Sequence, residues 1–196
     1  MIAPGDTSHL RWVDRTWIFL DIGFSSQRPS CGLLFGEARP ECVQFWEAKQ
    51  RILERVVSSP TQVGLVIEAP LSVCFGSNGN PKGRRIEKEG TKHRYWYENL
   101  GCQVMVAAMY IVREIHDANA MPIIHLFEGF VSFKDRSERS NHLSDVCLLR
   151  DVVREPKRFA ASIVTPDQLK SDPKDILESA FRVSGIDCGV PVVLKR

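Results

Sequence analysis

The sequence predicts an α/β domain built on a mixed β-sheet, and three observations lead to that prediction. Short, almost wholly apolar runs such as residues 16–22 (TWIFLDI) and 63–67 (VGLVI) are typical of strands buried inside a sheet. Between these runs, Ile52, Leu53, Val56 and Val57 recur at helical spacing. Strands and helices then alternate along the chain, which is the pattern of a sheet covered by helices on both faces.

Five strands and three helices make up the predicted core of this domain. The strands cover residues 16–22, 30–36, 41–46, 63–67 and 121–127, and the helices cover residues 47–59, 98–120 and 141–154. Short connections join the first three strands, so we expect an antiparallel meander there. Ser140 is the expected N-cap of the last helix. The order is therefore β-β-β-α-β-α-β-α, a mixed five-stranded sheet flanked by helices.

The rest of the chain surrounds this core. We expect residues 1–15 to form a loose N-terminal arm, residues 16–154 to form the domain, and residues 155–196 to form a C-terminal helical extension packed on it. In that extension, Asp172 and Pro173 indicate the start of a helix through Ile176, Leu177, Ala180 and Phe181 that Gly185 would end.

Two further segments complete the prediction. Residues 190–194 (VPVVL) are a candidate last strand. Residues 71–97 interrupt the alternation of strands and helices, because they are rich in glycine, asparagine and charged residues.

Composition restricts the environment of the protein. The chain has 196 residues and a formal net charge of +2, so its overall charge argues neither for nor against nucleic acid. The six cysteines are scattered without a CxxC pair, which indicates reduced packing residues and no zinc site. No run approaches the ~20 apolar residues of a membrane helix, and the N-terminus lacks a signal-peptide core. We therefore expect a cytoplasmic protein with no membrane partner.

Acidic residues stand at comparable places along the predicted sheet. Asp21, Glu68 and Glu128 each follow an apolar strand, and Asp145 lies early in the helix after the last of these strands. The carboxyl ends of neighbouring parallel strands meet at one edge of a sheet, so these carboxylates are expected to converge there. Mg²⁺ and Mn²⁺ favour such oxygen ligands and would relieve the repulsion between the carboxylates. Two such ions can activate a water and stabilise the leaving oxygen of a phosphodiester.

The element order and three acidic motifs resemble the ribonuclease H-like superfamily. The motifs are Asp21 in FLDIG, Glu68 in VIEAPLS and Asp145 in HLSDVCLL. Within the superfamily, the chain looks most similar to the Holliday-junction-resolvase-like branch and to the nuclease-like DUF429 group. IEAPLS, GNPKGRRIEKEG and HLFEGF resemble motifs of the latter group. The resemblance covers residues 16–154 and implies Mg²⁺- or Mn²⁺-dependent cleavage of nucleic acid.

The same resemblance implies roles for individual residues. Asp21 would bridge two metal ions, and Glu68 and Asp145 would each hold the metal cluster from one side. Glu128 would be a fourth acidic residue of the site. Gly23 would allow backbone or substrate to approach closely. Each acid also has a structural interpretation, since Asp21 is suited to a turn with Gly23 and Asp145 to the first turns of a helix.

A basic segment, residues 82–94, is the candidate nucleic-acid-binding region. It carries six Lys or Arg against two Glu, and three aromatic residues follow it. Cations contact phosphates and aromatic rings stack on bases. The candidate contacts are Lys82, Arg84, Arg85, Lys88, Lys92, Arg94 and Trp96. The alternative is a solvated loop whose aromatic residues anchor it to the core.

His142 and the overall function leave alternatives open. His142 precedes Asp145 by three residues and is suited either to face the site or to be a surface or capping residue. The leading hypothesis is a metal-dependent nuclease, and the second is a non-catalytic nucleic-acid-binding or protein-interaction module on the same fold. A phosphotransferase of the actin-like sugar-kinase type requires two such domains, for which the chain is too short. The sequence does not choose between DNA and RNA, and it leaves the oligomeric state open, a homodimer included.

Overall fold

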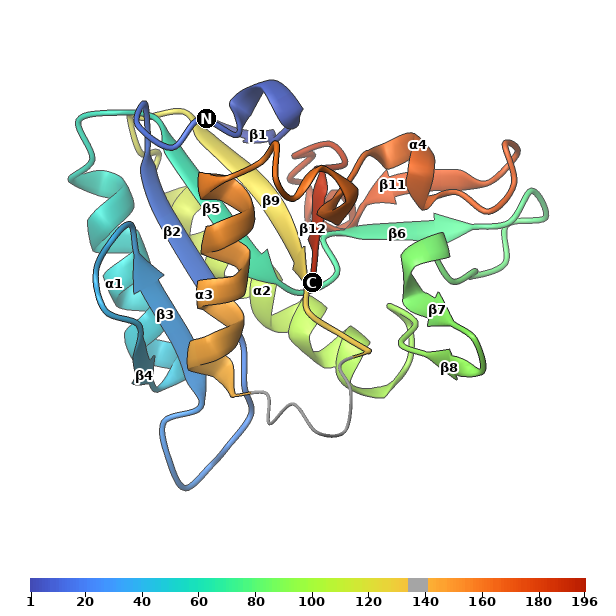
Figure 1. Cartoon of the computed structure of the whole chain (residues 1–196), viewed down its shortest axis with the longest axis horizontal. Helices are drawn as coiled ribbons and strands as arrows, with labels where there is room; N and C mark the ends of the chain where they lie inside the picture. The colour runs from blue at the N-terminus through green and yellow to red at the C-terminus, as the bar shows by residue number, and fades with distance from the viewer. Residues whose placement is uncertain (134–140) are drawn as a thin grey trace.

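A computed structural model describes residues 1–133 and 141–196 and confirms an α/β architecture with a mixed sheet (Figure 1). Within the described residues the main sheet has eight strands, seven of them in the order β10-β12-β9-β5-β2-β3-β4, with β1 paired to β9. Its strands are β1 Ile2–Pro4, β2 Thr16–Asp21, β3 Cys31–Phe35, β4 Glu41–Val43, β5 Val63–Glu68, β9 Ile124–Phe130, β10 Ile163–Val164 and β12 Val193–Lys195. The α-helices are α1 Phe45–Val57, α2 Asn99–Asp117, α3 His142–Arg154 and the short α4 Pro166–Leu169.

Strand direction follows the predicted order for the central part of this sheet. Strands β2, β3 and β4 form the antiparallel meander, whereas β5 runs parallel to β2 and β9 runs parallel to β5. The third strand is shorter than predicted, because helix α1 already begins at Phe45.

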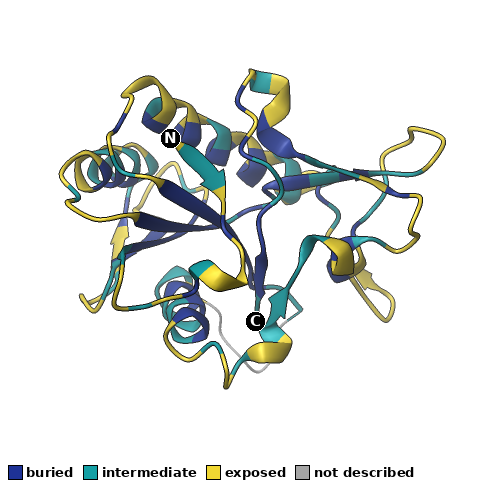
Figure 2. Cartoon of the chain, turned by 90° about the horizontal axis from the view of Figure 1, so that it is seen from above, coloured by how far each residue is buried: buried dark blue, intermediate teal, exposed yellow. Residues whose placement is uncertain are grey.

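Side chains of the central strands alternate between two apolar clusters, one on each face of the sheet. In β2, Ile18 and Leu20 pack with α1 and α2, whereas Trp17 and Phe19 pack with α3. Figure 1 shows α3 on one side of the sheet and α1 and α2 on the other, and Figure 2 shows the buried strands between helices with exposed outer faces. Successive strand residues point to opposite faces, so position in the strand decides which helix a side chain meets.

Both ends of the chain take part in the sheet, which corrects two predictions. Residues 1–15 are not a loose arm, because β1 pairs with the first half of β9 and a short 3-10 helix, η1 Thr7–His9, follows it. The C-terminal extension is not mainly helical, because β12 pairs with the second half of β9 and β10 pairs with β12. Strand β12 overlaps the candidate last strand at residues 190–194, and the sheet extends beyond the five strands of the predicted core.

The helix predicted after Pro173 is wrong. Residues Ile176–Ser179 form strand β11, which pairs antiparallel with strand β6, Ser72–Phe75. A 3-10 helix, η4 Ala180–Ser184, follows, and Gly185 ends it with a positive φ of 76° as expected for a helix stop. Residues 71–97, predicted without regular structure, contain strand β6, whose edge needs a hydrogen-bonding partner. Residues 176–179 supply that partner, so they form a strand despite the helical spacing of Ile176 and Ala180.

The same segment contains a short 3-10 helix and a small hairpin. They are η2 Arg85–Glu87, β7 Lys88–Glu89 and β8 Lys92–His93. The hairpin turns at Gly90, whose φ is +58°. Figure 1 shows β6 and this hairpin projecting together to one side of the main sheet.

Three smaller findings complete the fold. Asn141 is the N-cap of α3, where its side chain accepts a hydrogen bond from the Ser144 N–H, and the predicted cap Ser140 lies outside the described residues. All six cysteines are free thiols, and Cys42 is exposed rather than packed. Across residues 1–133 and 141–196, no helix combines the length and apolar character needed to cross a membrane.

Gly32 on β3 provides a test of how closely α3 packs on the sheet. A Cβ atom at Gly32 would lie 2.2 Å from the His142 carbonyl oxygen. We expect Gly32→Ala to lower the free energy of unfolding by about 1–3 kcal/mol, because the first turn of α3 must shift. Urea denaturation measures this change. Gly76→Ala is the matched control, since its nearest neighbour is the flexible Asn78 side chain at 3.0 Å, and equal effects of both substitutions would contradict the prediction.

Candidate acidic site at the carboxyl edge of the sheet

Asp21 and Glu68 lie side by side at the ends of two parallel strands. They are direct partners in the register of β2 and β5, and neighbouring residues in such a register project to the same face. Asp21 follows Phe19 and Glu68 follows Val66 on the face that α3 covers. Asp21 is buried, with 4% of its surface exposed, and Glu68 is partly buried. The register therefore brings two carboxylates together at the carboxyl edge of the sheet.

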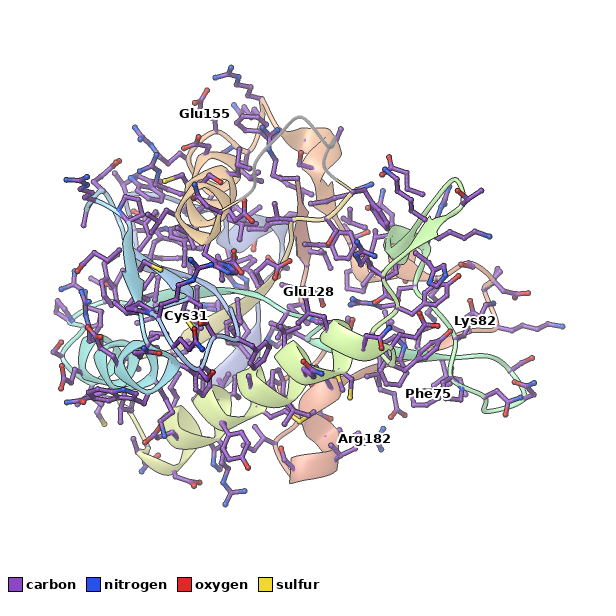
Figure 3. The ribbon with its side chains drawn as sticks, turned by 90° about the horizontal axis from the view of Figure 1, so that it is seen from below. Cys31, Phe75, Lys82, Glu128, Glu155 and Arg182 are labelled. Carbon is purple, nitrogen blue, oxygen red and sulfur yellow. The ribbon has the colours of Figure 1, made fainter. Side chains whose placement is uncertain are left out.

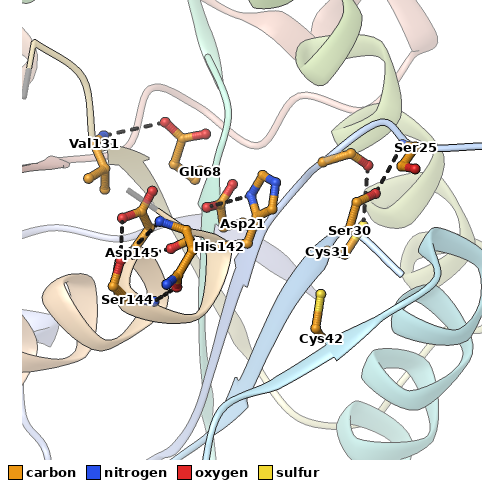
Figure 4. Close-up of polar contacts among 12 residues, drawn as sticks. Asp21, Ser25, Ser30, Cys31, Cys42, Glu68, Val131, His142, Ser144 and Asp145 are labelled. Carbon is orange, nitrogen blue, oxygen red and sulfur yellow. Dashed lines mark hydrogen bonds and ion pairs between the residues drawn. The ribbon is translucent and has the colours of Figure 1, made fainter. Parts of the chain in front are cut away.

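Helix α3 brings Asp145 to the same side. Val146 and Leu149 anchor the helix in the apolar cluster on this face, and Asp145 is 6% exposed. The Ser144 hydroxyl donates a hydrogen bond of 3.2 Å to Asp145 Oδ1. Figure 4 shows Asp145 with Asp21 and Glu68, the three acids that the sequence predicted to meet.

His142, the first residue of α3, contacts the site. Its Nδ1 lies 3.0 Å from Asp21 Oδ2, and 40% of its side chain is exposed (Figure 4). Gly23 makes this approach feasible, because a Cβ there would lie 2.6 Å from His142 Nε2 and 2.1 Å from the Ser30 carbonyl oxygen. The sequence offered His142 only as one of two alternatives. The signal in its favour was the spacing of three residues to Asp145, which keeps both side chains near one face of a helix.

The Glu68 carboxyl group has the most perturbed acidity of the site. Burial raises its pKa, and the negative charges of Asp21, Asp145 and Glu128 raise it further, to about 8. The Val131 N–H donates a hydrogen bond of 3.3 Å to Glu68 Oε1 and opposes this rise. Glu68 therefore holds a proton near neutral pH unless a cation offsets the neighbouring negative charges.

The structure does not bring Glu128 into this group. Glu128 pairs with Ile67 rather than Glu68, so it projects to the opposite face of the sheet, and Gly129 takes the position beside Glu68. A Cβ at Gly129 would lie 2.7 Å from a methyl group of Leu149, so no larger residue fits under α3 without a shift. Glu128 is fully buried, and Figure 3 places it in the middle of the molecule.

Glu128 instead belongs to a buried ionic cluster with Arg84 and Glu87. Arg84 Nη1 donates to Glu128 Oε2 at 2.7 Å, and Arg84 Nη2 donates to Glu87 Oε1 at 2.9 Å. The Leu71 N–H also donates to Glu128 Oε2, at 2.8 Å. Burial disfavours the charged guanidinium, but the two glutamates outweigh it and raise the Arg84 pKa. This cluster fastens residues 71–97 to strand β9.

The predicted nucleic-acid contacts divide into two groups. Arg84 and Trp96 are buried, which corrects the prediction that they lie on a binding surface. The Lys82 side chain is 37% exposed and pairs with Asp175 at 2.6 Å. Arg84 is buried because two glutamates compensate its charge, and the Trp96 Nε1–H donates to the Lys82 carbonyl oxygen. The other four cations are exposed: Arg85, Lys88, Lys92 and Arg94.

The carboxylates of the site are not arranged as a preformed metal centre. Among the described residues, no group of three or more His, Cys, Asp or Glu side chains has a geometry that could hold a metal ion. A scan against protein-family models and searches of curated proteins and solved structures returned no match. The candidate site therefore rests on its own geometry: three acids and one histidine at one sheet edge.

The raised pKa of Glu68 predicts a pH-dependent stability. The folded state binds this proton more tightly than the unfolded chain, whose glutamate titrates near 4.5, so stability falls as pH rises toward about 8. Between pH ~6.5 and ~8 we expect wild type to lose about 1–2 kcal/mol of unfolding free energy and Glu68→Gln to lose less. Urea denaturation at both pH values measures this. The exposed Glu155→Gln is the control and should behave as wild type; an unchanged slope in Glu68→Gln would contradict the assignment.

The buried ionic cluster predicts a strong dependence on Arg84. Arg84→Met leaves Glu87 and Glu128 buried without their cation, and we expect a loss of about 3–5 kcal/mol of unfolding free energy. Arg182→Met is the matched control, because both partners of its pair with Glu178 are exposed and such a surface pair contributes little to stability. Thermal and urea denaturation measure the free energy of unfolding of both variants. A small effect of Arg84→Met would show that the cluster is not needed for stability.

Proposed function

We propose that the chain is a metal-dependent nuclease that hydrolyses phosphodiester bonds of nucleic acid. The observation that carries the proposal is the placement of Asp21, Glu68 and Asp145 on one face at the carboxyl edge of the sheet. Burial and the neighbouring negative charges raise the pKa of Glu68, and a divalent cation would relieve the repulsion between these charges.

The sheet topology supports a ribonuclease H-like assignment, which we propose together with a relation to the Holliday-junction-resolvase-like and DUF429 groups. The order β4-β3-β2-β5-β9 places the antiparallel meander on one side of β2 and the parallel strands on the other. The resemblance of the FLDIG, VIEAPLS and HLSDVCLL motifs predicts such a sheet with its acids at the ends of β2 and β5 and on α3. Strands β1, β10 and β12 extend that sheet beyond β9.

The residues of the site suit Mg²⁺ or Mn²⁺ in chemistry. Asp21, Glu68 and Asp145 would hold the ion, since hard divalent cations take carboxylate oxygens as ligands. Such an ion, when bound, supplies activation of a water and stabilisation of the leaving oxygen. The three side chains have to turn toward one another to form a ligand group, because their described conformations do not form one. His142 holds the Asp21 carboxylate from the solvent side and orients it.

Substrate contacts are proposed for the exposed cations of residues 85–94. The four exposed cations lie on η2, on the β7–β8 hairpin or directly after it: Arg85, Lys88, Lys92 and Arg94. They lack the burial that excludes Arg84 from this role. Contacts of this kind are made to phosphates and do not depend on base sequence. They fit DNA and RNA equally.

One observation favours the second candidate, a non-catalytic nucleic-acid-binding module. Asp21 already has the His142 imidazole as a hydrogen-bond partner, and the acids of the described residues form no ready metal-ligand group. On this alternative the exposed cations bind phosphates and the acidic edge is structural. Binding would then persist after the removal of divalent ions.

A cleavage screen separates the two functions. Labelled single-stranded, duplex and branched DNA and RNA are incubated with Mg²⁺ or Mn²⁺, and binding is measured in parallel with EDTA. We expect cleavage by wild type, and a loss of at least ~100-fold in Asp21→Asn, because a ligand of the proposed metal is neutralised. Asp151→Asn, a more exposed aspartate of α3, is the matched control and should retain activity.

Two results would overturn the nuclease proposal. One is metal-dependent cleavage by folded Asp21→Asn at the wild-type rate. The other is tight binding in EDTA without cleavage under any divalent ion, which would establish the binding module instead. Circular dichroism and the thermal midpoint of each variant confirm that the fold is intact.

A further inference from the structure

A polar cavity lies at the opposite edge of the sheet from the acids. Its volume is about 660 Å³, and its polar lining comes from seven residues that precede or begin the central strands: Ser8, His9, Arg11, Asp14, Arg15, Gln62 and His125. Arg15 immediately precedes β2, and Asp21 ends it. Six strand residues span about 20 Å, so this cavity is separate from the acidic site.

Arg15 and His125 form the inner wall of this cavity. Arg15 Nη1 lies 2.6 Å from His125 Nδ1. A guanidinium has no acceptor, so Nδ1 must accept this hydrogen bond, and the imidazole is neutral with its proton on Nε2. His125 is 6% exposed; its burial, His9 and Arg15 together lower its pKa to about 4. The His9 ring lies over it, with ring centroids 3.8 Å apart.

The charge of Arg15 is incompletely compensated. Burial lowers the Arg15 pKa, so the site disfavours its cation, and the described residues place no carboxylate within 4.0 Å of its guanidinium. Arg15 Nε is buried without a hydrogen-bond partner among them. Asp6 and Asp14 act on it only at longer range, and Asp14 lies 3.9 Å from Arg11. The hydrogen bond of the Arg15 guanidinium goes to a neutral ring, and no carboxylate of the described residues lies within ion-pair distance of it, so an anionic ligand would compensate its charge.

We propose that this cavity binds the phosphate group of a small phosphomonoester. Arg15 offers a planar fork of donors suited to phosphate oxygens, and neutral His125 contributes an N–H donor to the same wall. Arg11 is a second cation of the lining, and the Asp14 carboxylate that lies 3.9 Å from it partly offsets its charge. The volume lies in the range of small-molecule sites and exceeds what a lone phosphate fills, so a mononucleotide-sized ligand fits. This site needs neither the acids nor a metal, and it stands independently of the proposed nuclease activity.

Isothermal titration tests the proposal with three probes in EDTA: inorganic phosphate, adenosine 5′-monophosphate and adenosine. We expect saturable binding of the monophosphate with a dissociation constant below about 1 mM, weaker binding of phosphate and none of adenosine. Arg15→Gln should weaken binding by roughly 10- to 100-fold, because it removes charge-assisted hydrogen bonds. Arg182→Gln is the matched control, since Arg182 is an exposed arginine on η4 that is absent from the cavity lining.

The outcomes are distinct from those of the cleavage screen. Arg11→Gln is a second variant at an exposed position, so a weaker affinity there supports the site even if Arg15→Gln does not fold. Asp21→Asn should bind the monophosphate as wild type does. The absence of saturable binding to any phosphate probe, equal binding of adenosine, or unchanged affinity in folded Arg15→Gln would each overturn the proposal.

Discussion

The in-register pairing of β2 with β5 is the constraint on which the acidic edge depends. It places Asp21 and Glu68 beside each other where two rigid, buried strands end. Burial there raises the pKa of Glu68, and the repulsion between the two carboxylates raises it further. Helix α3 completes the arrangement, because the residues that anchor it in the apolar cluster also fix Asp145 and His142. The fold therefore brings the acids together, and hydrogen-bond contacts with His142, Val131 and Ser144 help to hold them there.

On the opposite face of the sheet, a buried carboxylate is compensated by a buried arginine. There Glu128 meets Arg84 and Glu87 in a cluster that is fully enclosed. Burying three charges is costly, and the cluster is tolerated because each charge has a partner and the hydrogen bonds are short. Its consequence is structural: the cluster ties residues 71–97 to β9, while the cations Arg85, Lys88, Lys92 and Arg94 remain exposed.

The two edges of the sheet also differ in their charged groups. The carboxyl edge gathers Asp21, Glu68 and Asp145, and the amino edge gathers Arg11, Asp14 and Arg15 around a cavity. Strand β9 connects them, with His125 near its start and Gly129 beside Glu68 near its end. The N-terminal residues supply much of this cavity, because β1 pairs with β9 and places the residues after it at the start of the sheet.

Local patterns in the sequence determined the central strands, the three long helices and the acids at the strand ends, because apolar runs and helical spacing are short-range signals. Only the tertiary structure decided which acids meet. In the register of β5 and β9, Glu128 lies opposite Ile67, one residue before Glu68, so its side chain projects to the other face of the sheet. The sequence of neither strand contains this register. The tertiary structure also decided the place of Arg84, which the sequence predicted on the surface and which is buried between two glutamates. It likewise decided β11, whose residues have helical spacing but pair with β6. Long-range pairing set these features, because a buried charge or a strand edge is stable only with a partner that lies far away in the sequence.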